Sequence, residues 1–359
     1  MRPKSRSDFT VAIICALPIE AEAVEELFDE TYDTLSQFYG KQQGDDNIYT
    51  TGRMGKHHVV LCYMPGMGKR NAASVVSSLK TSYTRVEIAL AVGICGGVPF
   101  PRNKPPIFIG DVIVSDAVIE YDFGRQHPGG FQRKNGVKET LGQPNREIRS
   151  FLLGLRTKRT RGEFRDRVVG YLQGLQLRDQ KWVYPGKTLD VLCEPSHRHK
   201  HHEPGGRRTC SCMRKDSANS VCTEALETDC TVLGCVGAGV SHDRPDGEDT
   251  RPSVHIGTIA SADMVMRSGQ HRDRMAHEED VVGFDMEGAG IWDNISCLVI
   301  KGVSDYADSH KDKRWQAYAA AAGAAGAKTF LEYWRPAFRG MCSLEVACLS
   351  PRVLISCQI

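Results

Sequence analysis

Side chains capable of acid–base and sugar-binding chemistry follow three apolar runs of this chain. They are Glu20, Asp285, Met286, Glu287, Ser304 and Asp305. Two carboxylates at neighbouring strand ends can divide the roles of proton donor and sugar-binding group. A second interpretation stays open from the residues alone, in which these acids are solvated and begin helices, where they suit the helix dipole.

Two glycine-rich segments also follow apolar runs. PGMGKRNAA occupies residues 65–73 and VGICGGVP occupies residues 92–99. We expect both to be turns in which glycine lets backbone N–H groups approach a phosphate, carboxylate or sugar closely. Neither segment matches the Walker A motif or the dinucleotide-binding fingerprint, and a tight turn without a ligand is the alternative.

The surrounding pattern predicts an α/β fold with a largely parallel or mixed sheet and helices on its faces. Strand-like runs lie at 11–17, 58–64, 88–92, 111–118, 255–261, 281–285 and 297–303. Helical patterns lie at 71–80, 263–277, 288–293 and 314–334. In such sheets ligand groups gather at the carboxyl ends of the strands, which is where the acidic side chains fall.

The middle of the chain has a different character. We expect one domain at 8–334, interrupted at 125–253 by a diverged insertion, and a tail at 335–359. The insertion is charged and rich in His, Gly and Pro, with apolar pieces only at 147–155 and 168–175. This composition predicts short helical fragments and long, partly disordered loops.

Bulk composition excludes several classes of protein. The 359 residues carry a net charge of only +2, which gives no support to a nucleic-acid or membrane partner. No run of about 18 apolar residues is present, so no membrane span is predicted. The 13 cysteines are an odd number and several lie in apolar runs. We therefore expect buried free thiols and a cytoplasmic location.

Seven of the insertion's residues are of types that suit zinc: Cys193, His197, His199, His201, His202, Cys210 and Cys212. They lack paired CxxC spacing and lie in a loop-like composition. From the sequence we expect no metal and no cofactor.

Several ordered segments resemble the purine and uridine phosphorylase superfamily. They are VAIICALPIEAEAV, AVGICGGVP, GDVIVSD, VHIGTIAS, FDMEGAG and GVSDYADSHKDKRWQAYAAAA. The resemblance covers roughly 10–124 and 253–334 and is closest to fungal proteins in which the domain stands alone or precedes ankyrin or NTPase modules. It implies a three-layer α/β/α sandwich around a central mixed, partly barrel-like sheet, and a homo-oligomer.

The resemblance also implies roles for single residues in cleaving the N-glycosidic bond of a purine nucleoside or nucleotide. Asp305 matches the general acid that protonates the leaving base, and Glu287 matches the group that holds the ribose hydroxyls, with Met286 beneath the sugar. Asp285 stands where some nucleosidases carry a second Glu. Further expected substrate contacts are Ser304, Gly96, Cys95, Ile94, Ser261 and Val265.

Three positions favour water over phosphate as the attacking group. Ala91 and Ile94 stand where bacterial-type phosphorylases carry an anion-binding Arg and Ser, and Glu20 aligns with another phosphate-binding Arg. A carboxylate there repels phosphate, and it matches the water-activating base of the methylthioadenosine/adenosylhomocysteine nucleosidases. A phosphorolytic enzyme and a non-catalytic nucleoside-sensing module are the alternatives.

A 5′-phosphate is possible in this family. The candidate phosphate-facing residues are Gly66, Gly68, Arg53 and Arg70. Simple solvation at the surface is the favoured interpretation of the two arginines.

Overall fold

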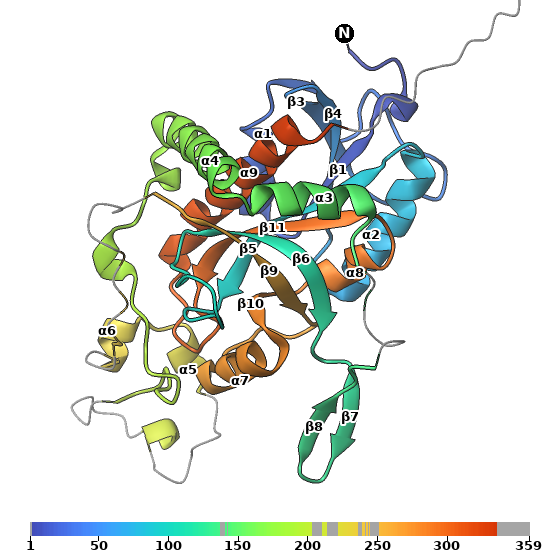
Figure 1. The fold of residues 1–359 in the computed structure, drawn as a ribbon. Helices are drawn as coiled ribbons and strands as arrows, with labels where there is room; N and C mark the ends of the chain where they lie inside the picture. The colour runs from blue at the N-terminus through green and yellow to red at the C-terminus, as the bar shows by residue number, and fades with distance from the viewer. Residues whose placement is uncertain are drawn as a thin grey trace, which may run out of the picture.

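A nine-stranded sheet organises the protein, which we describe from a computed structural model (Figure 1). The model describes residues 2–136, 141, 143–202, 210–213, 222–235, 239–240, 242, 244 and 251–335. Of the predicted tail, residues 336–359 lie outside this range. The strands run in the order β10 (Val281–Asp285), β9 (Val254–Ser261), β6 (Val112–Glu120), β11 (Cys297–Asp305), β5 (Ile88–Gly97), β1 (Val11–Cys15), β4 (His57–Tyr63), β3 (Tyr49–Met54) and β2 (Glu30–Asp33).

The sheet closes on itself in part. β10 pairs with β9 in parallel and also with β5 in antiparallel fashion, so β10, β9, β6, β11 and β5 form a ring. β1 extends the sheet from β5, and β4, β3 and β2 follow it outward. Parallel and antiparallel ladders both occur, which confirms the predicted mixed, partly barrel-like sheet.

Helices cover both faces of this sheet, as the sandwich prediction required. On one side α1 (Pro18–Glu25) and α9 (Gln316–Tyr333) share an apolar core with β1, β5 and β11. On the other side α2 (Lys69–Ser82) and α8 (Gly288–Trp292) share a second core with the same sheet. Because both faces are buried, the central strands read as continuous apolar runs rather than as an alternation.

The alanine- and glycine-rich sequence of α9 lets this helix lie unusually close to the sheet. Every residue from Tyr318 to Leu331 is buried. A Cβ atom built at Gly302 of β11 would lie 1.9 Å from the Ala319 carbonyl oxygen. Larger side chains at this contact would push the helix away from the strand that ends at Asp305.

The insertion contains more helix than the sequence predicted. α3 (Arg146–Leu155) agrees with the expected piece at 147–155, but α4 (Lys158–Arg178) is a single helix of 21 residues. Its charged first half is helical because Phe164, Val168, Leu172 and Leu175 form one buried stripe that packs beside α9. The charges occupy the opposite, solvated side of the helix.

Three further details differ from the sequence prediction. VGICGGVP was expected to be a turn, yet β5 continues to Gly97 because β11 and β10 pair with it. The helix expected at 263–277 is α7 (Gly269–Glu279), which begins six residues later. The strands β2 and β3 and the hairpin of β7 (Gly124–His127) and β8 (Gly130–Arg133) were not predicted.

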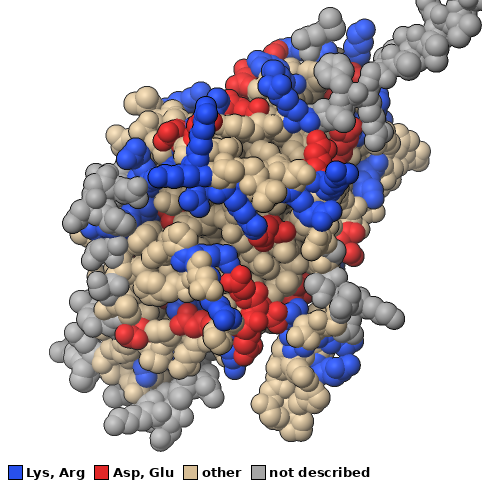
Figure 2. Space-filling view, viewed as in Figure 1, with Lys and Arg blue, Asp and Glu red and all other residues tan. Residues whose placement is uncertain are grey.

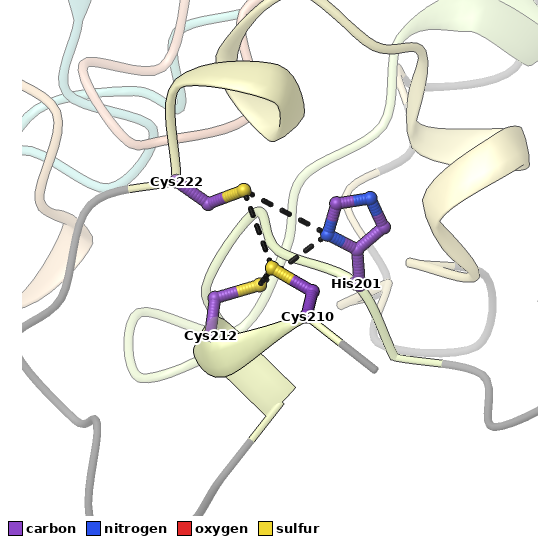
Figure 3. Close-up of side chains that lie close together, drawn as sticks. All are labelled: His201, Cys210, Cys212 and Cys222. Atoms are coloured by element: carbon purple, nitrogen blue, oxygen red, sulfur yellow. Dashed lines mark hydrogen bonds between the residues drawn. The ribbon is translucent and has the colours of Figure 1, made fainter. Parts of the chain in front are cut away.

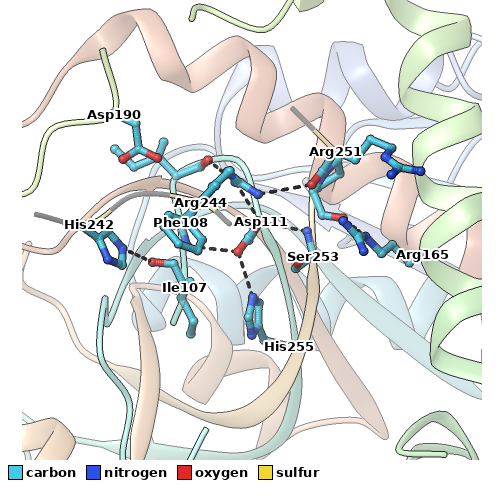
Figure 4. Close-up of polar contacts among 12 residues, drawn as sticks. Ile107, Phe108, Asp111, Arg165, Asp190, His242, Arg244, Arg251, Ser253 and His255 are labelled. Atoms are coloured by element: carbon cyan, nitrogen blue, oxygen red, sulfur yellow. Dashed lines mark hydrogen bonds and ion pairs between the residues drawn. The ribbon is translucent and has the colours of Figure 1, made fainter. Parts of the chain in front are cut away.

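A buried carboxylate ties the end of the insertion to the ring (Figure 4). Asp111 is fully buried and accepts hydrogen bonds from Arg244 at 2.9 Å, His255 Nε2 at 2.9 Å and the Ser253 N–H at 2.8 Å. Burial alone would raise the pKa of Asp111, but hydrogen bonding and charge from His255 and Arg244 outweigh it and lower that pKa.

Charged side chains cluster on parts of the surface although the net charge of the chain is small. Figure 2 shows Lys and Arg side chains gathered over the face formed by α3 and α4. Within the described part of the chain, no helix is both long enough and apolar enough to cross a bilayer.

Candidate functional site

A cavity of about 260 Å³ opens where β1, β5, β10 and β11 end. Most of the residues predicted from the sequence line it: Glu20, Ile94, Cys95, Gly96, Val265, Asp285, Met286, Glu287, Ser304 and Asp305. They come from opposite ends of the chain and meet because the ring brings their strands side by side.

Glu20 is held rigidly at the base of the cavity. The Glu20 side chain, in the first turn of α1, accepts hydrogen bonds from the N–H groups of Ala16 and Leu17 at 2.9 Å each and of Ile94 at 2.8 Å. Burial raises the pKa of Glu20, although the nearby Lys301 opposes this. Only glycine fits at position 93, since a Cβ atom there would lie 2.0 Å from Glu20 Oε1.

A buried lysine links the carboxylates. Lys301 of β11 is 2% exposed, and its Nζ lies 3.2 Å from Glu287 Oε2 and 3.9 Å from Asp285 Oδ2. Burial would lower the pKa of Lys301, but Glu287, Glu20 and Asp285 outweigh it and raise that pKa. Burial raises the pKa of Asp285 to about 6, against the effect of Lys301. Three acids thus surround one ammonium.

Asp305 lies on the other side of the cavity, at the end of β11. Its carboxylate accepts hydrogen bonds from Ser304 Oγ at 3.0 Å and the Ala307 N–H at 2.9 Å. Lys311 Nζ lies 2.6 Å from Asp305 Oδ1 and forms an ion pair with it. A Cβ atom at Gly96 would lie 3.0 Å from the same oxygen, so the bare backbone of β5 lets the carboxylate approach.

The remaining predicted residues lie outside the cavity lining. Ser261 is fully buried and accepts a hydrogen bond from the Ala289 N–H at 3.1 Å. The Gly68 N–H donates to Glu287 Oε1 at 3.4 Å from the start of α2. Gly66 lies in the preceding turn and Arg70 is exposed on α2. Arg53 is on β3 beside Asp29 and Glu30, at 3.7 and 3.9 Å, because β3 pairs toward the edge of the sheet.

Sequence reasoning missed Lys301, Lys311 and Arg267. Lys301 had a signal, because it is the one charge inside the apolar run CLVIKGV. Lys311 and Arg267 line the cavity, but their positions in polar loops carried no signal. Aromatic and thioether groups complete the lining: Tyr121, Phe284, Met67, Met264 and Met266.

This arrangement can perform general acid–base chemistry next to a cation. The cavity floor carries more negative than positive charge, since among the described residues Lys301 is the one cationic side chain that pairs with its acids, Glu20, Asp285 and Glu287. A fixed negative field of this kind stabilises positive charge that develops in a bound molecule and repels an anion.

The chain is similar in sequence to several known proteins. A family model described as the phosphorylase superfamily matches residues 10–162. A nucleotide-binding leucine-rich repeat (NLR)-like protein of the fungus Hyaloscypha variabilis is 31% identical over 90% of this chain, which spans only 29% of that relative. A 5′-methylthioadenosine/S-adenosylhomocysteine nucleosidase of Mycobacterium tuberculosis is 29% identical over 32% of this chain and 39% of its own length.

Solved structures share the fold at low sequence identity. The 5′-methylthioadenosine/S-adenosylhomocysteine nucleosidase of Neisseria meningitidis, in complex with methylthio-immucillin-A, superposes with a TM-score of 0.52 at 16% identity, covering 90% of this chain and 99% of its own. Futalosine hydrolase of Helicobacter pylori gives a TM-score of 0.51 at 14% identity, covering 92% and 100%. Both are nucleoside phosphorylase folds, as the sequence predicted.

Proposed function

Because this chain carries a domain of the phosphorylase superfamily, we propose that it hydrolyses the N-glycosidic bond of a purine nucleoside or nucleotide and releases the base. One observation carries the proposal: Glu20, Asp285 and Glu287 surround Lys301 at the floor of a cavity whose wall presents Asp305. The names of the mycobacterial and neisserial relatives, which are nucleosidases, support the same reaction class.

Each group has a defined part in the proposed reaction. The bond between C1′ and the base breaks with its electron pair going to the base, while Asp305 delivers a proton to the purine. The sugar becomes positive, and Glu287 holds its hydroxyls and faces the charge. Water attacks C1′, and its proton passes to Glu20.

Lys311 is proposed as a positioning residue. Its ion pair keeps the carboxyl of Asp305 turned toward the cavity. For Asp305 to protonate a purine, the carboxyl must carry a proton, so this ion pair has to open or exchange when the base binds.

Water suits the floor of this cavity better than phosphate does. The backbone N–H of Ile94, which could have bound an anion, already donates to Glu20. Phosphate would also meet the excess negative charge at short range, where Coulomb repulsion is strongest. The basic side chains among the described lining residues are Lys311, paired with Asp305, and the exposed Arg267.

A substrate panel tests the proposed function. Adenosine, inosine, guanosine, methylthioadenosine, AMP and ATP are incubated with the full chain, with and without phosphate, and base release is followed by chromatography. We expect release without phosphate, and release slower by about 10²-fold or more from Asp305→Asn. Strict phosphate dependence would favour the phosphorylase alternative and overturn hydrolysis.

A non-catalytic nucleoside-binding module is the second candidate function. It is favoured by the fungal NLR-like relative, in which this chain corresponds to only part of a much longer protein. Calorimetry on the wild-type chain tests this candidate. Binding of a nucleoside without release of its base would support the binding module against the enzyme.

A further inference from the structure

Thiols and imidazoles of the insertion gather into two neighbouring groups outside the proposed reaction. The first, the cysteine-rich cluster, consists of His201, Cys210, Cys212 and Cys222 (Figure 3). Their ligand atoms all lie within 4.8 Å of one another. Three segments separated along the chain supply them, and Figure 3 shows the four side chains turned toward a common centre.

Three of the four separations inside the cysteine-rich cluster are close to those of ligands around one ion, and the fourth, between Cys210 and Cys212, is shorter. His201 Nδ1 lies 3.3 Å from Cys212 Sγ and 3.8 Å from Cys222 Sγ, and Cys210 Sγ lies 3.0 Å from Cys212 Sγ and 3.6 Å from Cys222 Sγ. Zinc–sulfur bonds of about 2.3 Å in a tetrahedron place two sulfurs roughly 3.8 Å apart, and sulfur and nitrogen slightly closer. A disulfide would instead need a separation of about 2.05 Å, and these thiols are free.

We propose that His201, Cys210, Cys212 and Cys222 bind one structural zinc ion. Three thiolates and one imidazole form a closed ligand set with no position left for water, which is typical of structural rather than catalytic zinc. The sequence predicted no metal because these residues lack paired CxxC spacing and lie in a loop-like composition, whereas Cys222 joins them only in the folded chain. Folding supplies the remaining ligands.

A second cluster of possible ligands supports another zinc ion beside the first. We call it the histidine-rich cluster, and its members are His197, His199, Cys230, Cys235 and His310. Within it, Cys235 belongs to two groups of three possible ligands. One group adds His197 and His310, and the other adds His199 and Cys230. His199 Nδ1 lies 3.4 Å from Cys230 Sγ and 3.6 Å from Cys235 Sγ.

His310 gives this second cluster its independent support. Its side chain is 4% exposed, and its Nδ1 lies 3.7 Å from Asp308 Oδ1, which is beyond hydrogen-bond distance. Within the described residues neither ring nitrogen has a hydrogen-bond partner. His197 Nε2 is also buried and unpartnered there. Buried nitrogens without partners are costly, and an ion centred on Cys235 would satisfy them. We infer a second zinc site with Cys235 as its central ligand.

The second ion would connect the insertion to the proposed reaction. His310 directly precedes Lys311, whose ammonium pairs with Asp305. A cavity of about 500 Å³ is lined by Cys235, His310, Lys311 and Asp305 together. Zinc would therefore hold the loop that carries Lys311, a consequence that rests on the proposed function, whereas the metal sites themselves do not.

Metal analysis of the purified full chain tests both sites. We expect about two zinc ions per chain, about one in Cys222→Ala and at most one in Cys235→Ala. Cys297→Ala, a buried cysteine of β11 outside both clusters, and His127→Ala, on the exposed hairpin, should keep both ions. Adenine release measured on the same samples separates failure of the metal sites from failure of the proposed function.

Several results would overturn the inference. Less than about a tenth of an equivalent of zinc in folded protein removes both sites. A disulfide between Cys210 and Cys212, found by mass spectrometry, removes the first site. If the wild-type chain holds only one ion, and this ion is kept in Cys235→Ala but lost in Cys222→Ala, the second site is removed. If the variants do not fold, cobalt is added to chelator-treated wild-type protein. Absorption from thiolate-bound tetrahedral cobalt supports the sites, and its absence overturns them.

Discussion

The carboxylate site of the ring and the thiol clusters of the insertion differ in how their closely spaced, electron-rich side chains are stabilised. Both bring side chains with concentrated electron density into a small space. In the ring, backbone N–H groups hold Glu20, and Lys301 compensates its neighbours. In the cysteine-rich cluster, within the part of the chain that the structure describes, the hydrogen bonds of the four side chains join them to one another. The carboxylates of the ring are therefore stabilised by the protein itself, whereas the proposed zinc ion would stabilise the cysteine-rich cluster.

This contrast indicates where each region obtains its rigidity. The ring is surrounded by two apolar cores and keeps its charges in place with regular hydrogen bonding. Near the thiol clusters, the described residues of the insertion have only a small apolar cluster, formed by Ala225, Leu233 and Cys235. Small cores of this kind usually need a metal or a disulfide to become stable.

The largest expected effect comes from removing the buried positive charge of Lys301, which pairs with acidic side chains in the ring. Lys301→Met leaves Glu287 and Asp285 buried without their cation, so the free energy of unfolding should fall by about 3–5 kcal/mol. Urea denaturation measures it. Lys313→Met is the matched control, because its ion pair with Glu227 in the insertion is exposed at both ends and should contribute almost nothing. Equal losses in the two variants would refute the contrast.

Next in size is the loss of the proposed general acid. Asp305→Asn should reduce turnover by about 10²-fold or more, since the leaving base is no longer protonated. Zinc content should be unchanged, which separates the two regions. Asp280→Asn serves as control: this exposed residue has φ of 52°, a conformation that Asn accepts. Wild-type turnover in Asp305→Asn would reject the assignment.

The pH dependence of hydrolysis should reflect the ring and not the insertion. Glu20 must be unprotonated to accept a proton from water, and burial raises its pKa. kcat/KM should therefore fall by about tenfold per pH unit as pH drops below that raised value. Asp285, with a pKa of about 6, gains a proton in the same direction. Glu163→Gln, on the exposed side of α4 beside Arg159, should leave the profile unmoved. A flat acidic limb in wild-type protein would argue against Glu20.

The smallest expected effect is at the rim of the cavity. Arg267→Ala should raise KM for AMP relative to adenosine by about two- to fivefold, the size of an exposed ion pair. Arg70→Ala is the control, because Arg70 was a candidate for facing phosphate but does not line the cavity. The ratio of the KM for AMP to the KM for adenosine, measured in each variant, decides between the two arginines. A larger effect at Arg70 would restore the original prediction.

The sequence was sufficient to predict the fold class and most of the cavity lining. Glu20, Asp285, Glu287 and Asp305 each follow an apolar strand, and strand ends of such sheets converge. The stripe of α4 was recognised only in part, since dense charge on one face masked the apolar spacing before Val168.

Contacts between distant segments could not be predicted. Arg53 appeared close to a phosphate-facing loop, yet strand order places it toward the sheet edge. The pairing of Lys311 with Asp305, and the convergence of Cys222 on His201, depend on loops whose courses no local pattern specifies. The homo-oligomer and the cytoplasmic location stay predictions.

The double pairing of β10 has a consequence for how the protein folds. By joining β9 to β5, it makes the cavity a product of both halves of the chain: Glu20 and Ile94 come from the first, and Asp285 and Asp305 from the second. Contacts over such long sequence separations form late and slowly during folding. A translation intermediate that ends before β10 would contain apolar strands and Glu20, but no pocket. Nucleoside affinity should therefore appear only when the ring closes, so that ligand protection against proteolysis reports completion of the fold.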